Sequence, residues 1–150
     1  MNTLKNISFY IIIGVIISFL GKYLESDFLF KYLKENIIGL LLTLLAINTA
    51  TLGLIASKIQ DIVVDYPKFD FSTTIKEMKI SLLEQIILIS VSVITLLLLD
   101  SKKIELASKI DIGNIILTAV LIYSINILWD TGKAVFVVIE ELQKMKQNEK

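Results

Sequence analysis

Apolar residues along the chain gather into four long blocks, which are separated by short charged segments. The flanking charges place these blocks at 6–21, 36–57, 80–99 and 112–129. At a rise of about 1.5 Å per residue, each block approaches the roughly 30 Å of a bilayer core once a few flanking residues are added. The blocks show no alternation of apolar and polar residues, which disfavours membrane strands. The pattern predicts an all-α integral membrane protein with four transmembrane helices in a small bundle.

Capping and turn residues refine the ends of these helices. Ser26 and Asp27 are N-cap candidates before the second block. Thr74 and Glu77 have the spacing of a capping box, which predicts that the third helix begins about six residues before its apolar part. Pro67, the single proline, marks the turn between these two helices. We therefore predict one domain with helices over about 6–24, 27–62, 75–99 and 112–139.

The end of the chain leaves two alternatives. Residues after Gly132 are apolar again, and a single helix over 112–139 would be about 42 Å long, more than one crossing needs. Either the last helix projects from the membrane, or it bends at Gly132 and lies along the surface. In the second case, residues 133–147 would lie on that surface. The helix that ends at 139 is predicted to be followed by a short cytoplasmic tail over 140–150.

Lysine counts predict the orientation. The N-terminus, the segment 58–79 and the tail together hold nine lysines, whereas the segments 21–35 and 100–111 hold six. The excess of positive charge favours a multi-pass protein of the cell inner membrane with both termini in the cytoplasm. Each connecting segment has as many acids as lysines, so no basic field for nucleic acid or anionic lipid is present.

Composition supports a membrane protein and argues against catalysis. Of the 150 residues, 55% are hydrophobic, and the mean hydropathy is +0.74. The chain has no His, Cys or Arg, which excludes imidazole or thiolate metal sites, Ser-His triads and bidentate arginine clamps. No pair of aspartates lies inside the blocks. We therefore expect neither an enzyme nor a bound metal or cofactor, and the lipid bilayer is the first partner.

Small residues follow one face of the second block at spacings of 4, 3, 4, 3 and 4. The members of this small-residue stripe are Gly39, Thr43, Ala46, Ala50, Gly53 and Ser57. Such a stripe lets two membrane helices approach closely. Packing against another helix of the same chain is favoured over a subunit interface or a pore lining. Asn48 lies off the stripe and needs a partner of its own, because an amide at mid-membrane should face protein or water.

The third and fourth blocks carry polar stripes. On the third, the stripe contains Glu84, Ser92 and Thr95, and Glu84 is the only acid inside an apolar block. An intramembrane carboxylate indicates a functional site, unless it reaches water or Lys58 at the membrane edge. On the fourth, Tyr123 and Asn126 share a face. If the stripes surround a water-filled axis, Glu84 from several copies forms an acidic ring that favours cations.

Two functions from different classes fit these features. The first is a homo-oligomeric membrane pore or ion channel, because several copies of four short helices are needed to enclose a water path. The second is a non-conducting membrane scaffold that recruits a cytoplasmic partner.

One stretch resembles a known family. Residues 35–39 (ENIIG), 44–53 (LLAINTATLG) and 57–59 (SKI) are similar to the four-pass channel effectors of Hailong-type bacterial anti-phage systems, over about a fifth of the chain. The resemblance implies a homo-tetrameric channel that a cytoplasmic nucleotide-derived ligand holds closed, and that opens on infection to depolarise the cell and arrest growth. Candidate contacts for that ligand, or for lipid headgroups, are Lys58, Lys76 and Lys79.

Overall fold

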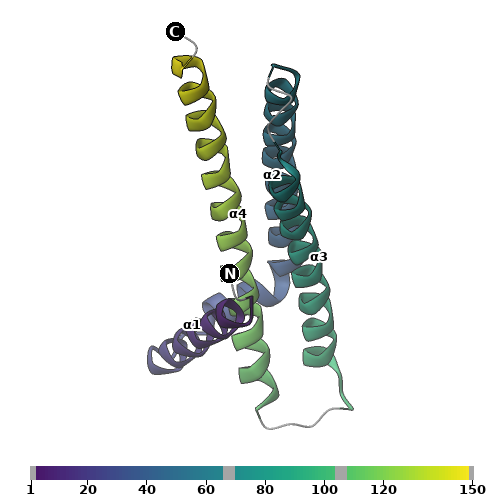
Figure 1. Cartoon of the computed structure of the whole chain (residues 1–150). Coiled ribbons are helices and arrows are strands. Elements are labelled where there is room, and N and C mark those ends of the chain that lie inside the picture. The colour runs from purple at the N-terminus through teal and green to yellow at the C-terminus, as the bar shows by residue number, and fades with distance from the viewer. Residues whose placement is uncertain (1–2, 66–69, 104–107, 149–150) are drawn as a thin grey trace.

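The computed structural model describes residues 3–65, 70–103 and 108–148, and all secondary structure within them is helical (Figure 1). The prediction of an all-α protein is confirmed. The four helices are α1 (Thr3–Tyr23), α2 (Phe28–Asp65), α3 (Ser72–Asp100) and α4 (Lys109–Asn148).

The observed helices are longer than predicted at several ends, most of all α4. This helix continues through Gly132 without interruption and reaches Asn148. The predicted bend at Gly132 is therefore wrong, whereas projection of the helix from the membrane stays a prediction. Ala134, Val135 and Val138 explain the difference, because they pack against α2 and continue the buried face beyond the apolar block.

Local hydrogen bonds explain where three helices end or begin. After α1, Glu25 adopts a positive φ of 51°, and the Ser26 and Glu25 N–H groups donate to the carbonyls of Gly21 and Lys22. This is a Schellman motif with glutamate in the position that glycine usually takes. The Asp27 carbonyl then accepts the first α2 bond, from the Lys31 N–H, which agrees with the predicted start.

The start of α3 differs from the prediction. The helix begins at Ser72, where the Asp70 carboxylate accepts hydrogen bonds from the Ser72 backbone N–H at 2.8 Å and from its hydroxyl at 3.0 Å. Thr74 and Glu77 thus lie inside the first turns, and the predicted capping box is wrong. The two hydrogen bonds from Ser72 lower the pKa of the Asp70 carboxyl.

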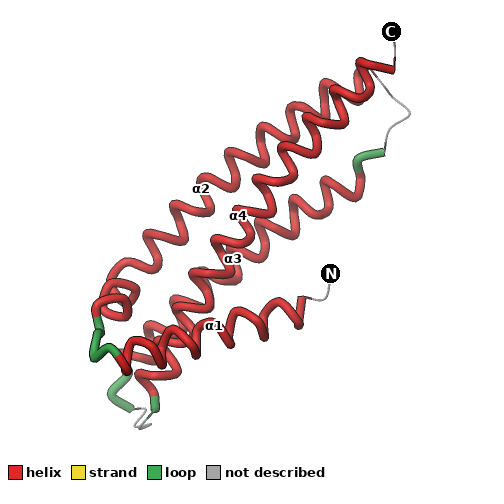
Figure 2. The backbone as a smooth tube through the Cα atoms, turned by 90° about the vertical axis from the view of Figure 1, so that its left-hand side faces the viewer, coloured by secondary structure: helices red, strands yellow, loops and turns green. Residues whose placement is uncertain are grey.

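Helix α4 is the centre of the bundle, because it packs against each of the other three helices. Figures 1 and 2 show α2, α3 and α4 running alongside one another, whereas α1 crosses α4 near one end. The first turns of α2 run across the bundle before that helix turns along it (Figure 1). At the α1 crossing, a Cβ on Gly14 would lie 2.6 Å from the Ile115 carbonyl oxygen, so only glycine permits this approach.

Three helices are long and apolar enough to cross a bilayer: α2 over Phe28–Val64, α3, and α4 over Lys109–Glu140. The apolar part of α1, Ile7–Tyr23, is shorter, and a crossing by α1 stays a prediction. Large apolar side chains such as Phe19, Leu54 and Leu97 are exposed around the bundle. A soluble domain of this size rarely exposes so much apolar surface, whereas lipid accommodates it.

The interior of the bundle has two apolar clusters. The first lies toward the α1 end and is centred on Leu33, Ile37, Leu41, Leu88, Leu117, Val120 and Ile127. The second lies toward the opposite end and is centred on Leu52, Ile55 and Ile59 of α2. Along α2, the buried residue between the two clusters is Asn48, so a polar layer separates them.

Candidate functional site

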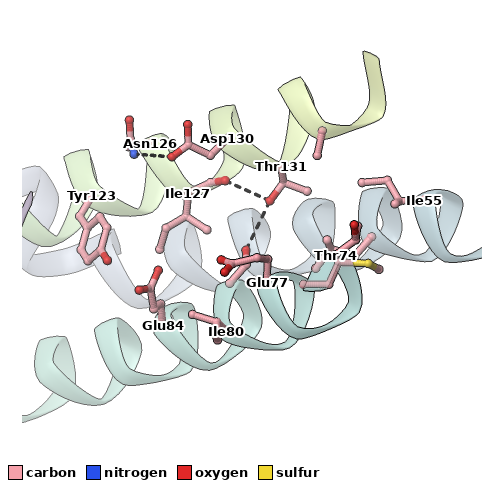
Figure 3. A pocket seen from close by; sticks show the side chains of 14 residues that line it. Ile55, Thr74, Glu77, Ile80, Glu84, Tyr123, Asn126, Ile127, Asp130 and Thr131 are labelled. Carbon is pink, nitrogen blue, oxygen red and sulfur yellow. Dashed lines mark hydrogen bonds between the residues drawn. The ribbon is translucent and has the colours of Figure 1, made fainter. Parts of the chain in front are cut away.

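A cavity of about 530 Å³ lies between α3 and α4, with part of α2 as its floor (Figure 3). We call it the acidic groove. Its polar lining comes from α3 and α4: Thr74, Glu77, Ser81, Glu84, Tyr123, Asn126, Asp130 and Thr131. Residues such as Leu52, Ile55 and Ile127 provide its apolar walls.

Helical periodicity brings these side chains together. On α3, Glu77, Ser81 and Glu84 follow one another at spacings of 4 and 3, so they share one face. On α4, Tyr123 precedes Asn126 by 3 and Asp130 by 7, which again places them on one face. The two helices pack side by side and turn these faces toward the same space. Glu84 of the predicted α3 stripe and Tyr123 and Asn126 of the predicted α4 stripe therefore line one groove, whereas Ser92 and Thr95 lie outside it.

The groove carries three carboxylates, of which one is paired. Asp130 forms an ion pair with Lys133 at 2.7 Å and accepts a hydrogen bond from Asn126 at 3.0 Å. Neither Glu77 nor Glu84 belongs to an ion pair within the described residues. The groove is therefore negative overall.

Glu84 is half-buried and lies deeper in the apolar block than the other acids. Its carboxylate and the Tyr123 hydroxyl point toward one another (Figure 3). Lys58, one of the two partners considered for an interfacial Glu84, instead pairs with Asp61 at 3.0 Å on its own helix. Tyr123 in turn stacks on Tyr10 of α1, with ring centroids 4.8 Å apart. The Glu84 carboxylate therefore lies beside the Tyr123 hydroxyl, and no lysine of the described residues forms an ion pair with it.

Beside the groove lies the polar layer between the two apolar clusters. Asn48 is completely buried and donates to the Ser81 hydroxyl and to the Gln85 side-chain carbonyl, each at 3.0 Å. Ser81 lies 3.3 Å from the Thr131 hydroxyl, which itself donates to the Ile127 carbonyl at 3.0 Å. The layer therefore joins α2, α3 and α4. The expected partner for Asn48 is found, and it belongs to the same chain.

Further buried polar atoms extend from this layer along the bundle. Five buried polar atoms have no hydrogen-bond partner among the described residues: Asn48 Oδ1, Gln85 Nε2 and the hydroxyls of Ser92, Thr118 and Ser124. Other helical hydroxyls behave differently, because Thr95 and Ser90 each donate to the carbonyl four residues earlier. Beyond Ser92, Thr95 lines a second cavity of about 250 Å³ between α3 and α4, near Lys109.

The structure separates the predicted site residues into two groups. Glu84, Ser92, Thr95, Tyr123, Asn126 and Asn48 lie in the groove or in the interior of the chain's own bundle. The small-residue stripe of α2 lies elsewhere: Gly39, Thr43, Ala46, Ala50, Gly53 and Ser57 are all exposed. A Cβ on Gly39 or Gly53 would meet no atom within 4 Å. Packing of the stripe inside the chain is therefore wrong, and its role at a subunit interface stays a prediction.

The lysine candidates lie apart from the groove lining. Lys58, Lys76 and Lys79 are exposed, and none of them lines either cavity. Their contact with a ligand or with headgroups stays a prediction. Among the residues that the structure describes, no three acidic side chains are placed to hold a metal ion.

Sequence reasoning missed several residues of the interior. Thr118, Ser124 and Thr131 are buried on α4, and Tyr10 is buried on α1. A signal existed, because Leu117, Ser124 and Thr131 repeat every seven residues, the spacing of one packed helix face. That face was overlooked because the neighbouring face, with Tyr123 and Asn126, is more polar.

Comparison with protein-family models, curated proteins and solved structures finds no match, so the functional assignment rests on the residues themselves.

Proposed function

We propose that this chain is the subunit of a homo-oligomeric membrane pore that conducts cations through the acidic groove. The observation that carries the proposal is Glu84, a half-buried carboxylate in the apolar part of a helix long enough to span a bilayer. A charged group at such a place costs several kcal/mol unless it pairs or faces water, and such residues commonly mark ion pathways. No described lysine pairs with Glu84, which favours water in the groove.

The electrostatics of the groove favour cations over anions. Glu77 and Glu84 lie on one wall, and the opposite wall contributes Asp130, whose charge is compensated by its ion pair with Lys133. A negative lining raises the local concentration of cations and repels anions. The volume of about 530 Å³ is room for several water molecules around an ion.

Assembly into an oligomer is supported by the outer face of α2. Its small-residue stripe is exposed along the part of the helix that is long and apolar enough to cross a bilayer, and both of its glycines have open space around them. Small residues allow the backbones of two membrane helices to approach closely. A second copy of the chain is the proposed occupant, and a tetramer follows from the resemblance to Hailong-type effectors. The same proposal includes a role in antiviral defence. A cytoplasmic nucleotide-derived ligand would hold the pore closed, and its opening would depolarise the cell and arrest growth.

A flux experiment on the purified protein in liposomes tests the proposal. We expect potassium efflux from vesicles that contain the chain, and a reversal potential that indicates a preference for potassium over chloride. Glu84→Gln should assemble as the wild type does and shift the reversal potential toward that of an unselective pore. Glu35→Gln is the matched control, because Glu35 is exposed on α2 and lies outside the groove. Coincident reversal potentials for wild type and Glu84→Gln would remove Glu84 from the ion path.

The alternative function is a non-conducting scaffold, and one observation favours it. Beyond the apolar blocks, α4 continues with exposed Phe136, Val137 and Ile139, a surface that a protein partner could cover. An oligomer that forms in liposomes and gives no flux under any ionic condition would support this function over the pore.

A further inference from the structure

We propose that the ion route runs inside each protomer, between α3 and α4, and that the apolar side chains of Leu88 and Leu117 form its closed gate. This inference deepens the proposed function and rests on it. The usual expectation for an oligomer of small chains is a route on the symmetry axis. The structure supports a different one, because the polar stripe of α3 faces the interior of its own bundle.

The two cavities mark the ends of this route. The acidic groove opens between the first part of α3 and the second half of α4. The second cavity, of about 250 Å³, lies between the end of α3 and the start of α4, where Thr95 faces Gly113 and Ile116. Because α3 and α4 are antiparallel neighbours, these cavities lie at opposite ends of the same helix pair.

Buried polar atoms without partners lie between the two cavities. Ser92 comes one turn before Thr95 on α3, and Ser124 comes one turn before Ile127 of the groove on α4. Both serines are buried, at 0% and 1% exposure, and neither hydroxyl has a hydrogen-bond partner. Gln85 Nε2, which follows Glu84 in the chain, is also buried without a hydrogen-bond partner among the described residues.

Water is the hydrogen-bond partner that these buried polar atoms require. A buried hydroxyl or amide without a partner is destabilising by about 1–3 kcal/mol, and a bilayer core offers no water from outside. Helical serine can satisfy itself on the preceding turn, as Ser90 does with the Ile86 carbonyl. Ser92 and Ser124 do not, so their hydroxyls remain available to water that enters from the cavities.

The middle of the route is closed by apolar side chains. Leu88 and Leu117 are buried at 8% and 1% exposure and belong to the same cluster, with Val120 beside them. A short apolar constriction between two wet ends stops ions by excluding water, and it opens when the helices separate slightly. Along α3, Ser92 lies between Leu88 and Thr95 of the second cavity, and along α4, Ser124 lies between Leu117 and Ile127 of the groove.

Single cysteines test this route directly, because the native chain has none. The protein is reconstituted in vesicles, and a membrane-impermeant cationic methanethiosulfonate is added from one side at a time. We expect Ser124→Cys to react from the groove side and Ser92→Cys from the opposite side. Both should react about tenfold or more faster than Ser90→Cys, because only a thiol in contact with water ionises to the reactive thiolate. Ser90 is the matched control, since it is exposed on the lipid side of α3.

The outcomes separate the route from the pore itself. Modification of the two interior thiols together with ion flux supports the internal route. Modification without any ion flux would show only that water enters the protomer, and it would overturn the pore proposal and the ion route that rests on it. Ion flux together with interior thiols as unreactive as Ser90→Cys places conduction between subunits and overturns the internal route. If Ser92→Cys fails to fold, Ser124→Cys on the other helix decides. A Leu88→Ala variant adds an independent check, because a wider gate should increase flux, and an unchanged or lower flux would contradict the gate.

Discussion

Replacement of Asn48 by alanine should destabilise the bundle more than any other single asparagine substitution in the described helices. Asn48 has no exposed surface and donates two hydrogen bonds to α3, at 3.0 Å each. Hydrogen bonds between membrane helices contribute about 0.6 kcal/mol on average and up to about 1.7 kcal/mol. Two such bonds predict a loss of about 1–3 kcal/mol in the free energy of unfolding.

Asn36 provides the matched control. It lies on the same helix and donates its one described side-chain hydrogen bond to the Tyr32 carbonyl, within α2. Asn36→Ala should therefore change the unfolding free energy by no more than about 0.5 kcal/mol. Unfolding in SDS can be followed by the fluorescence of Trp129, the single tryptophan.

A double-mutant cycle makes the test specific to the polar layer. Asn48→Ala and Gln85→Ala should show a coupling energy of about 0.6–1.7 kcal/mol, because each variant removes the same hydrogen bond. Additive effects of the two substitutions, or an Asn48→Ala variant no less stable than Asn36→Ala, would refute the reasoning that this layer holds α2 to α3.

Three further predictions concern the helix ends and the glycines. Glu25→Gly should raise the unfolding free energy by about 1 kcal/mol, because glycine adopts the positive φ at this Schellman position without strain; equal or lower stability in SDS would contradict this. Gly14→Ala should weaken the docking of α1, because the alanine Cβ would lie 2.6 Å from an α4 carbonyl oxygen. Gly53→Ala is the control and should leave the protomer as stable as the wild type or more stable. Similar losses of unfolding free energy in both variants would count against the packing of α1 on α4. The stabilisation of α3 by the Asp70 carboxylate should depend on pH, because the pKa of this carboxyl is lowered in the folded chain. The stabilisation is complete at pH values above about 3.9, the ordinary pKa of aspartate. It is lost as the pH falls through the lowered pKa of the folded chain. Amide exchange at Ser72 should then be faster in Asp70→Ala than in wild type at neutral pH, with the difference vanishing in strong acid; a difference that persists there would contradict the cap.

Most of the helical architecture could be predicted from the flanking charges. Charged residues cannot enter a bilayer core without cost, so they limit each apolar block, and the helices follow. The ends were less predictable. The start of α3 depends on which of several polar residues captures the first N–H, and Asp70 does so before Thr74 can. The extension of α4 depends on packing against α2, which no local pattern reveals.

Which face of each helix points inward could not be derived in the same way. In a membrane chain both faces of a helix are apolar, so hydrophobic periodicity does not distinguish lipid from core. On α2 the small residues suggested the packed face, yet larger residues such as Ile37, Leu41 and Ile55 fill the interior. The polar residues were better guides. Asn48 and Glu84 were expected to avoid lipid, and both face protein or the groove.

The docking of α1 on α4 has a consequence for biosynthesis. Gly14 and its contact Ile115 are about 100 residues apart in the chain. At a synthesis rate of about 5–20 residues per second, the first helix waits on the order of 5–20 s before its docking surface has been made. During that interval Tyr10 has no Tyr123 on which to stack, and α1 lacks the helix against which it packs in the fold. Premature termination before residue 115 would leave α1 without the helix that it packs against, and its apolar surface would stay uncovered by protein.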